Sequence, residues 1–170
     1  YNMEVYGFKD SFEGMVNNDF QKLGYADVSG ILTLGGTILG TSNTANPWRW
    51  PKENKNGEVS FTDVSKQAMA NFNDLGLSCL IAIGGDGTMN IAHRFVESGI
   101  PVVGVPKTID NDLKGTQYTF GFDTAVSIIT EAIDRLHSTA ESHHRVMVLE
   151  VMGRHAGWLA VVGGIAGGAD

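Results

Sequence analysis

Apolar residues along this chain gather in short runs that alternate with segments of helical periodicity. Continuous apolar runs at residues 3–8, 77–83, 101–105 and 145–151 predict strands. A shorter run, residues 31–34, leads into a Gly-Gly turn. Because strands that are apolar on both faces are typical of parallel sheets, the pattern indicates a parallel sheet with helices on each side.

Four segments have the periodicity of amphipathic helices: residues 61–75, 88–98 and 123–140, and a segment from about His155. The apolar stripe of the longest one consists of Ala125, Ile128, Ile129, Ala132, Ile133 and Leu136. Asp123 is its predicted N-cap. Helices that alternate with strands in this way predict an α/β fold.

The chain is predicted to form one domain over residues 1–170, since it is long enough for a core and has no internal repeat or visible boundary. Residues 43–57 are the one long irregular segment, and such loops are often functional.

Charge and cysteine content narrow the function classes. The net charge of −7 argues against a nucleic-acid surface, so anionic ligands would be bound by local groups such as helix N-termini and single arginines. The single cysteine, Cys79, lies in an apolar run and is predicted to be buried, and a disulfide framework is excluded. No apolar stretch reaches the roughly 18 residues of a membrane span, and no signal peptide opens the sequence, so the cytoplasm is the expected location.

The first polar cluster, Gly84-Gly85-Asp86-Gly87-Thr88, directly follows a predicted strand and opens a helix. Ligands of open parallel sheets bind beyond the carboxyl ends of the strands. Glycines let the backbone approach a phosphate, whose charge the free N–H groups of the helix attract. Asp86 is suited to Mg²⁺, which binds carboxylates together with phosphate oxygens. A plain Gly-rich turn capped by Asp86 is the alternative, and NAD kinases and lipid kinases share the GGDGT motif.

The second polar cluster, residues 106–112 with the sequence PKTIDND, follows the predicted strand 101–105. Two carboxylates, Asp110 and Asp112, lie two residues apart beside a threonine and a lysine. A base for a hydroxyl group needs a carboxylate within hydrogen-bond reach. An Asx-turn would explain one of these residues but not the whole run.

The third cluster, Met152-Gly153-Arg154-His155, follows the predicted strand 145–151, which Arg145 opens. Arginine is the residue that binds phosphate in a bidentate manner. An arginine at a helix start is more often a plain surface residue. The interpretation of this cluster as a phosphate site therefore depends on the presence of the other two clusters.

In this order and spacing the three clusters resemble the phosphofructokinase family, which also has motifs matching residues 35–40 (GGTILG) and 121–125 (GFDTA). The resemblance runs over essentially the whole chain, and PKTIDND with MGR separates it from NAD and lipid kinases. It implies an α/β fold, a three-layer parallel-sheet Rossmann-like domain that binds the nucleotide or other phosphoryl donor. It also implies phosphoryl transfer from MgATP to the C1 hydroxyl of fructose 6-phosphate.

The resemblance implies catalytic roles position by position. Asp110 would take the proton from the C1 hydroxyl, with Thr108 and Asp112 orienting the phosphoryl group and the metal. Arg154 would stabilise charge on the moving phosphoryl group. The residues expected to bind the donor are Gly85, Asp86, Gly87, Thr88 and Lys107, of which Asp86 would also hold Mg²⁺.

The resemblance also implies the sugar site and the partners. The residues expected to bind fructose 6-phosphate are Thr108, Asp110, Asp112, Arg145, Met152, Gly153 and Arg154. Arg145 would reach the 6-phosphate of a neighbouring subunit, which implies a homo-oligomer with shared sites. Neither nucleic acid nor a membrane is expected as a partner.

Departures from the family pattern leave alternatives open. The chain has no GGDxPGxN loop and stops before the second, sugar-phosphate domain, so the fold is expected to be incomplete at both ends, and a non-catalytic binding module is one alternative. Asn43 stands where short bacterial members carry a phosphate-binding arginine. Lys107 resembles the pyrophosphate-using and mixed-substrate branch, whereas Gly87 favours ATP, because pyrophosphate enzymes usually have Asp there. A pyrophosphate-dependent enzyme is the other alternative.

Overall fold

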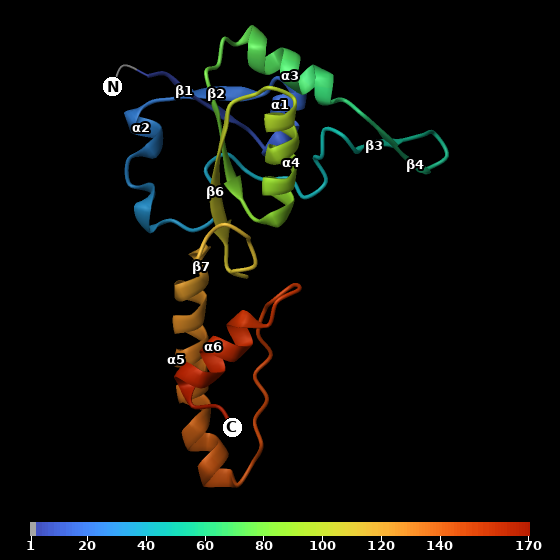
Figure 1. The fold of residues 1–170 in the computed structure, drawn as a ribbon. Helices are drawn as coiled ribbons and strands as arrows, with labels where there is room; N and C mark the ends of the chain where they lie inside the picture. Colours follow the sequence, from blue (N-terminus) through green and yellow to red (C-terminus); the bar gives the residue numbers. More distant parts are fainter. Residues whose placement is uncertain (1–2) are drawn as a thin grey trace. The chain divides into compact units, whose positions relative to one another are not determined.

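The strands form two antiparallel pairs and one three-stranded parallel sheet in a computed structural model that describes residues 3–170 (Figure 1). The chain divides into two units, Tyr1–Ser78 and Cys79–Asp170. The antiparallel pairs belong to the first unit, and the parallel sheet belongs to the second.

The first unit is built around helices α1 (Phe12–Asn17) and α3 (Ser65–Asp74), which pack against each other. Their buried apolar side chains are Phe12, Met15, Val16, Ala68 and Phe72. On either side of α1 in the sequence lie β1 (Val5–Phe8) and β2 (Phe20–Leu23), which pair in the register Val5↔Leu23 to Phe8↔Phe20. The strand predicted at residues 3–8 is therefore present, but it pairs antiparallel with β2 rather than in the predicted parallel sheet, and the sequence pattern predicts neither α1 nor β2.

Two side-chain amides of α3 satisfy the end of α1. The Gln67 amide nitrogen donates to the carbonyl of Val16 at 2.9 Å. The Asn71 amide nitrogen donates to the carbonyls of Met15 and Val16 at 2.9 and 3.0 Å. The backbone at Asn18 caps the Gly14 carbonyl of α1, and α3 satisfies the Met15 and Val16 carbonyls, which have no donor within the helix.

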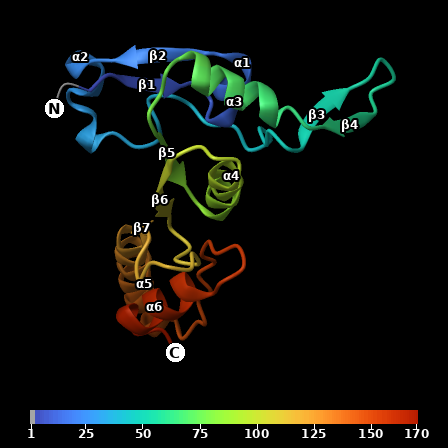
Figure 2. The same cartoon turned by 45° about the horizontal axis from the view of Figure 1, so that its top comes forward.

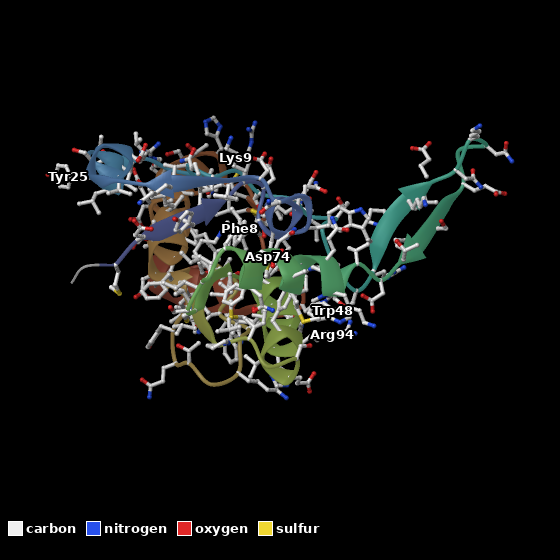
Figure 3. The ribbon with its side chains drawn as sticks, turned by 90° about the horizontal axis from the view of Figure 1, so that it is seen from above. Phe8, Lys9, Tyr25, Trp48, Asp74 and Arg94 are labelled. Carbon is white, nitrogen blue, oxygen red and sulfur yellow. The ribbon has the colours of Figure 1, made fainter. Side chains whose placement is uncertain are left out.

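The connection after β2 is largely exposed. It contains α2 (Tyr25–Val28) and the 3₁₀ helix η1 (Ile31–Thr33). Tyr25 is 86% exposed and points away from the ribbon in Figure 3. The apolar run at residues 31–34 thus becomes a turn of 3₁₀ helix on the surface.

A two-stranded hairpin projects from the first unit (Figure 1). It pairs β3 (Trp50–Glu53) with β4 (Val59–Thr62) inside the segment that was predicted to be irregular or helical. The guanidinium carbon of Arg49 lies 4.2 Å from the centre of the Phe61 ring, a cation–π contact across the two strands' ends. The helix predicted at residues 61–75 therefore begins only at Ser65.

The second unit begins with a strand–helix–strand crossover. β5 (Leu80–Gly84) and β6 (Val102–Thr108) pair in parallel from Leu80↔Val102 to Gly84↔Pro106. The connecting helix α4 (Asp86–Glu97) packs on both strands (Figure 2). The short strand β7 (Phe120–Gly121) adds to the end of β6 through Lys107↔Phe120 and Thr108↔Gly121.

The two faces of this small sheet differ in exposure. Ala82 of β5 is 5% exposed, and Phe95 of α4 is fully buried. The alternate positions Ile81, Ile83 and Val103 are 62%, 60% and 55% exposed. Side chains alternate across a strand, so α4 covers one face, and the face that carries Ile81, Ile83 and Val103 is open.

Helices α5 (Phe122–His143) and α6 (Trp158–Gly167) lie side by side (Figure 1). Two glycines of α6 allow their close approach. A Cβ atom on Gly163 would lie 2.5 Å from Cγ2 of Ile129, and one on Gly167 would lie 2.8 Å from Cδ1 of Ile133. The apolar stripe predicted for residues 123–140 supplies both isoleucines.

Overpacking this contact should destabilise the protein. We expect Gly163→Ala to lower the free energy of unfolding by about 1–3 kcal/mol, because the added methyl group collides with Ile129. Gly164→Ala is the matched control, since a Cβ there meets only the Ala169 methyl at 3.8 Å. Urea unfolding of both variants checks this; equal stability of the two would contradict the contact.

Three sequence predictions are wrong in this structure. Residues 145–151 form no strand, since they pair with no strand of the sheet, and Val146 and Val148 are 94% and 89% exposed. Cys79 is exposed rather than buried, since β5 starts only at Leu80. Asp123 is not the N-cap of α5, because the helix begins one residue earlier and Gly121 holds the cap position.

The boundaries of other elements differ by a few residues. α4 starts at Asp86, two residues before the predicted start, and β6 continues to Thr108. α6 starts at Trp158 rather than near His155. None of the helices within residues 3–170 combines the length and apolarity that crossing a membrane requires.

Candidate active site

The first two polar clusters start at the same edge of the parallel sheet. Gly84 at the end of β5 is paired with Pro106 of β6, so the turn 84–88 and the loop 106–112 leave the sheet next to each other. A Cβ atom on Gly85 would lie 3.5 Å from Cβ and 3.7 Å from Oγ1 of Thr108. The structure thus brings together two of the three clusters, as parallel pairing requires.

The turn at residues 84–88 is folded tightly on itself. Thr88 folds back over Gly84, where a Cβ atom would lie 2.3 Å from the threonine Oγ1. Gly85 takes the N-cap position, and its carbonyl accepts the Met89 N–H at 3.0 Å as the first helical hydrogen bond. The three preceding N–H groups, from Asp86 to Thr88, therefore have no acceptor within the helix. Free N–H groups at the start of a helix attract anions.

The catalytic loop predicted at residues 106–112 has an internal hydrogen-bonded pair. The Thr108 hydroxyl donates to Oδ2 of Asp110 at 3.3 Å. The Asp110 backbone N–H donates to the Thr108 hydroxyl oxygen at 3.2 Å. Both residues are half-buried. The hydroxyl therefore ties both the backbone and the carboxylate of Asp110 to the end of β6.

Lys107 and Asp112 flank this pair in the sequence, and among the described residues neither shares a hydrogen bond or ion pair with it. Lys107 is exposed, and Asp112 is half-buried. Across residues 3–170, no ion pair joins Lys107 to Asp86, Asp110 or Asp112. Because side chains alternate along a strand, Lys107 points to the opposite face from Thr108.

Among the described residues, no hydrogen bond joins the third cluster to the loop at residues 106–112. Arg145, Met152, Gly153 and Arg154 all belong to the connection between α5 and α6, and all are exposed. In the described part of the chain, the only hydrogen bond that any of them makes outside the regular elements is that of the Arg145 N–H to the Ala140 carbonyl, at 3.0 Å. The connection is drawn as an irregular tube between α5 and α6 in Figure 1.

A magnesium ion fits this site only as a partner of donor phosphates. No group of three or more His, Cys, Asp or Glu side chains that could hold a metal ion occurs within residues 3–170. Asp86 is a single exposed carboxylate in the first turn of α4. Mg²⁺ is commonly held by one or two carboxylates plus phosphate oxygens and water, and Asp86 can supply the protein's share.

Sequence reasoning missed two residues of this loop. Asn111 accepts the Thr119 N–H through Oδ1 at 2.9 Å, across eight residues. Thr119 is 4% exposed, although its neighbours in the sequence are polar or aromatic. The sequence feature that indicates a role for Asn111 is its uncharged side chain between two carboxylates.

Comparison with known proteins gives one consistent family. A family model described as phosphofructokinase matches residues 1–170. The chain is 55% identical over 170 residues to an ATP-dependent 6-phosphofructokinase 2 of Clostridium perfringens, covering 100% of the chain and 46% of that protein. It is 57% identical over 164 residues to a pyrophosphate–fructose 6-phosphate 1-phosphotransferase of Amycolatopsis mediterranei, covering 96% of the chain and 45% of that protein. The chain thus spans about half the length of these relatives.

Solved structures agree on the fold. A Pichia pastoris phosphofructokinase in the T-state matches with a TM-score of 0.78 and 34% identity, covering 100% of the chain and 19% of that protein. A pyrophosphate-dependent phosphofructokinase from Marinobacter aquaeolei matches with a TM-score of 0.72 over 96% of the chain and 41% of that protein. At 22% identity the second likeness bears on the fold alone. The predicted α/β fold class is confirmed.

Proposed function

Because the chain belongs to the phosphofructokinase family, we propose that its protein transfers a phosphoryl group to the C1 hydroxyl of fructose 6-phosphate, giving fructose 1,6-bisphosphate. The observation that carries this proposal is the close approach of the turn at Gly85 to Thr108, whose hydroxyl binds Asp110. Phosphoryl transfer needs an anion site for the donor beside a carboxylate for the acceptor hydroxyl, and the free N–H groups of α4 and the Asp110 carboxylate support assigning both to this sheet edge.

In the proposed reaction, a carboxylate oxygen of Asp110 takes the proton of the C1 hydroxyl while the hydroxyl oxygen attacks the terminal phosphorus of the donor. The bond from that phosphorus to the bridging oxygen breaks, and the shortened donor leaves. Thr108 holds the Asp110 carboxylate in place through its hydroxyl group. Asp112, on the same loop, orients the phosphoryl group. This arrangement uses positioning and charge rather than a covalent enzyme intermediate.

The donor side of the site is proposed to lie at the start of α4. The backbone N–H groups of Gly85, Gly87 and Thr88 would bind phosphate oxygens, and Lys107 would add a positive charge. Asp86 would hold Mg²⁺, which when bound neutralises charge on the donor phosphates. We propose that residues 1–170 act together as the donor-binding domain with the catalytic loop.

We propose ATP as the donor and pyrophosphate as the alternative. The relatives support both, since the C. perfringens protein is named for ATP and the A. mediterranei protein for pyrophosphate, at similar identity. The Gly87 position favours ATP, because a Cβ atom placed there meets no atom within 4 Å and the space beside the phosphate chain is open.

An assay of the whole protein tests the proposal. Fructose 6-phosphate and Mg²⁺ are supplied with either ATP or pyrophosphate, and fructose 1,6-bisphosphate is measured directly. We expect product with ATP at a higher kcat/KM than with pyrophosphate. Absence of product with both donors, together with no calorimetric binding of fructose 6-phosphate or MgATP, would instead support a non-catalytic module.

The sugar side of the site is proposed to include the third cluster. Met152 and Gly153 would contact the sugar, and Arg154 would stabilise charge on the moving phosphoryl group. Arg145 is proposed to reach the 6-phosphate in a neighbouring subunit of a homo-oligomer. Its exposure at the end of α5 supports this, because the guanidinium is open to a second chain. The expected location stays the cytoplasm, as the amino-acid sequence predicts.

Loss of Arg145 should act on one substrate only. We expect Arg145→Ala to raise KM for fructose 6-phosphate by about tenfold or more and to change KM for the donor by less than about twofold, because only the sugar phosphate loses its bidentate partner. Steady-state kinetics with each substrate varied in turn measures this. Arg135→Ala, which removes an exposed arginine paired with Glu131 on α5, is the control. Equal effects on both substrates would contradict the shared site.

A further inference from the structure

We propose that Asn111 is a positioning residue for Asp110, because its side chain and its backbone conformation hold the loop after β6 closed against the start of α5. The inference rests on the proposed function, in which Asp110 is the base. It adds a residue that contacts neither substrate and acts through the loop that carries the carboxylate.

The first observation is a hydrogen bond that closes the loop. Oδ1 of Asn111 accepts the backbone N–H of Thr119 at 2.9 Å. Thr119 is 4% exposed and Asn111 is half-buried, so water competes poorly for this bond. If the acceptor were removed, the Thr119 N–H would be left buried without a partner, and a buried donor without a partner is costly. Loss of the acceptor would therefore favour opening of the loop, because the open loop exposes the Thr119 N–H to water.

The second observation is the backbone of Asn111. Its φ is 50°, in the left-handed region that asparagine adopts more readily than most residues. Asn111 directly follows Asp110, so this conformation sets the direction in which the chain leaves the base. Asp110 is thus held from both sides: Thr108 binds its carboxylate and its N–H, and Asn111 fixes the residue after it.

The third observation is that Thr119 is bonded to the buried start of α5. The Phe122 N–H donates to the Thr119 carbonyl at 3.2 Å, and the Phe122 side chain is 3% exposed. Gly121 has a φ of 106°, and a Cβ atom on it would lie 3.2 Å from Cγ2 of Ile109. Thr108 pairs with Gly121 in the sheet. Asn111 is therefore tied to the buried start of α5 and not to a mobile surface turn.

The chemistry of the side chain fits this role. Its neighbours Asp110 and Asp112 are carboxylates, so a third carboxylate between them would add like charge beside the base. An amide oxygen accepts the Thr119 N–H without adding charge. Asparagine therefore combines three properties at this position: an acceptor, a neutral group and tolerance of the left-handed backbone.

Two variants separate the acceptor from the backbone conformation. Asn111→Gly keeps the left-handed conformation but has no acceptor, and Asn111→Asp keeps both and adds charge. Thr116→Ala is the control, because it removes another hydrogen bond of the same loop, from the Thr116 hydroxyl to the Tyr118 carbonyl at 2.8 Å, that does not involve Asn111. Each is made in the whole protein, and both kinetics and hydrogen–deuterium exchange around Thr119 are measured.

We expect Asn111→Gly to lower kcat by about 10- to 100-fold with KM for fructose 6-phosphate within about threefold, because a small displacement of the base costs rate more than binding. The Thr119 amide should exchange about tenfold faster or more. Asn111→Asp should keep the amide protected and shift the acidic limb of the kcat profile to higher pH, since an added carboxylate disfavours ionisation of its neighbour. Thr116→Ala should leave kcat unchanged, because it keeps the bond between Asn111 and Thr119; its exchange result shows how much loosening the Tyr118–Thr119 peptide unit tolerates without loss of rate.

Three outcomes would overturn the proposal. One is unchanged kcat in Asn111→Gly despite faster exchange at Thr119, which would leave a structural tie without a role in positioning. Another is unchanged exchange, which would remove the tie itself. The third is that Asn111→Asp, which keeps the acceptor, loses the protection of the Thr119 amide and the activity as fully as Asn111→Gly does. If the glycine variant does not fold, the same loss in Asn111→Asp relative to the wild type still overturns the proposal. Exchange is read without substrate, so its result is distinct from a failure of the proposed function.

Discussion

Asp110→Asn should lower kcat by about 10²–10⁴ and leave both KM values nearly unchanged. Asparagine keeps the shape of the side chain, and its amide oxygen can still accept the Thr108 hydroxyl at the position of Oδ2. It cannot take a proton from the C1 hydroxyl, so only the chemical step suffers. Initial rates at saturating fructose 6-phosphate and donor measure the effect.

A charge-matched control accompanies this variant. Asp74→Asn removes an exposed carboxylate from the end of α3, which Figure 3 labels, and should leave kcat unchanged. Circular dichroism of both variants checks that the fold is kept. A kcat of Asp110→Asn within threefold of the wild type would remove Asp110 from the role of base.

The second large effect is expected at Gly87. Gly87→Asp should lower kcat/KM for ATP by about 100-fold or more, because it puts bulk and like charge beside the nucleotide phosphates. The free protein accommodates the change: a Cβ atom at this position meets no atom within 4 Å, and an acidic residue in the first turn of a helix is favourable. Pyrophosphate use should persist or rise, because the shorter donor leaves this space empty and Lys107 still supplies charge.

The matched variant for this test is Gly87→Ala, which adds a methyl group to the same space without charge. We expect a smaller fall in kcat/KM for ATP, because the methyl group is shorter than the Asp side chain. Both donors are tested in the wild type and in both variants. A wild type that already prefers pyrophosphate would overturn the argument from Gly87 and favour the pyrophosphate-dependent alternative.

The parts of the site that could be predicted are those encoded by adjacent residues. The turn at residues 84–88 and the loop at 106–112 each follow a short apolar run directly, and parallel pairing of β5 with β6 brings them to one edge. The positions and the parallel direction of two strands are enough to predict that these two loops meet at one edge of the sheet. The tie between Asn111 and Thr119 spans eight residues of irregular chain, and no periodicity predicts such a bond.

The errors arise where an element depends on a partner. Residues 145–151 have the composition of a strand, but a segment becomes a strand only when it pairs with a neighbouring strand, and these residues pair with none. β2 and α1 show the opposite case: their sequence pattern is weak and they are short, yet they form because β1 and α3 pack against them. The exposure of Cys79 likewise depends on where β5 begins.

The amide caps that α3 places on α1 couple the two helices in their unfolding. α1 has six residues, too few to persist alone in water, since isolated helices shorter than about 12–15 residues are marginal. Its Met15 and Val16 carbonyls are satisfied by Gln67 and Asn71, and its buried residues pack against the same helix as well as against β1. Melting of α3 would remove both supports at once. The two helices are therefore expected to open together as one cooperative unit.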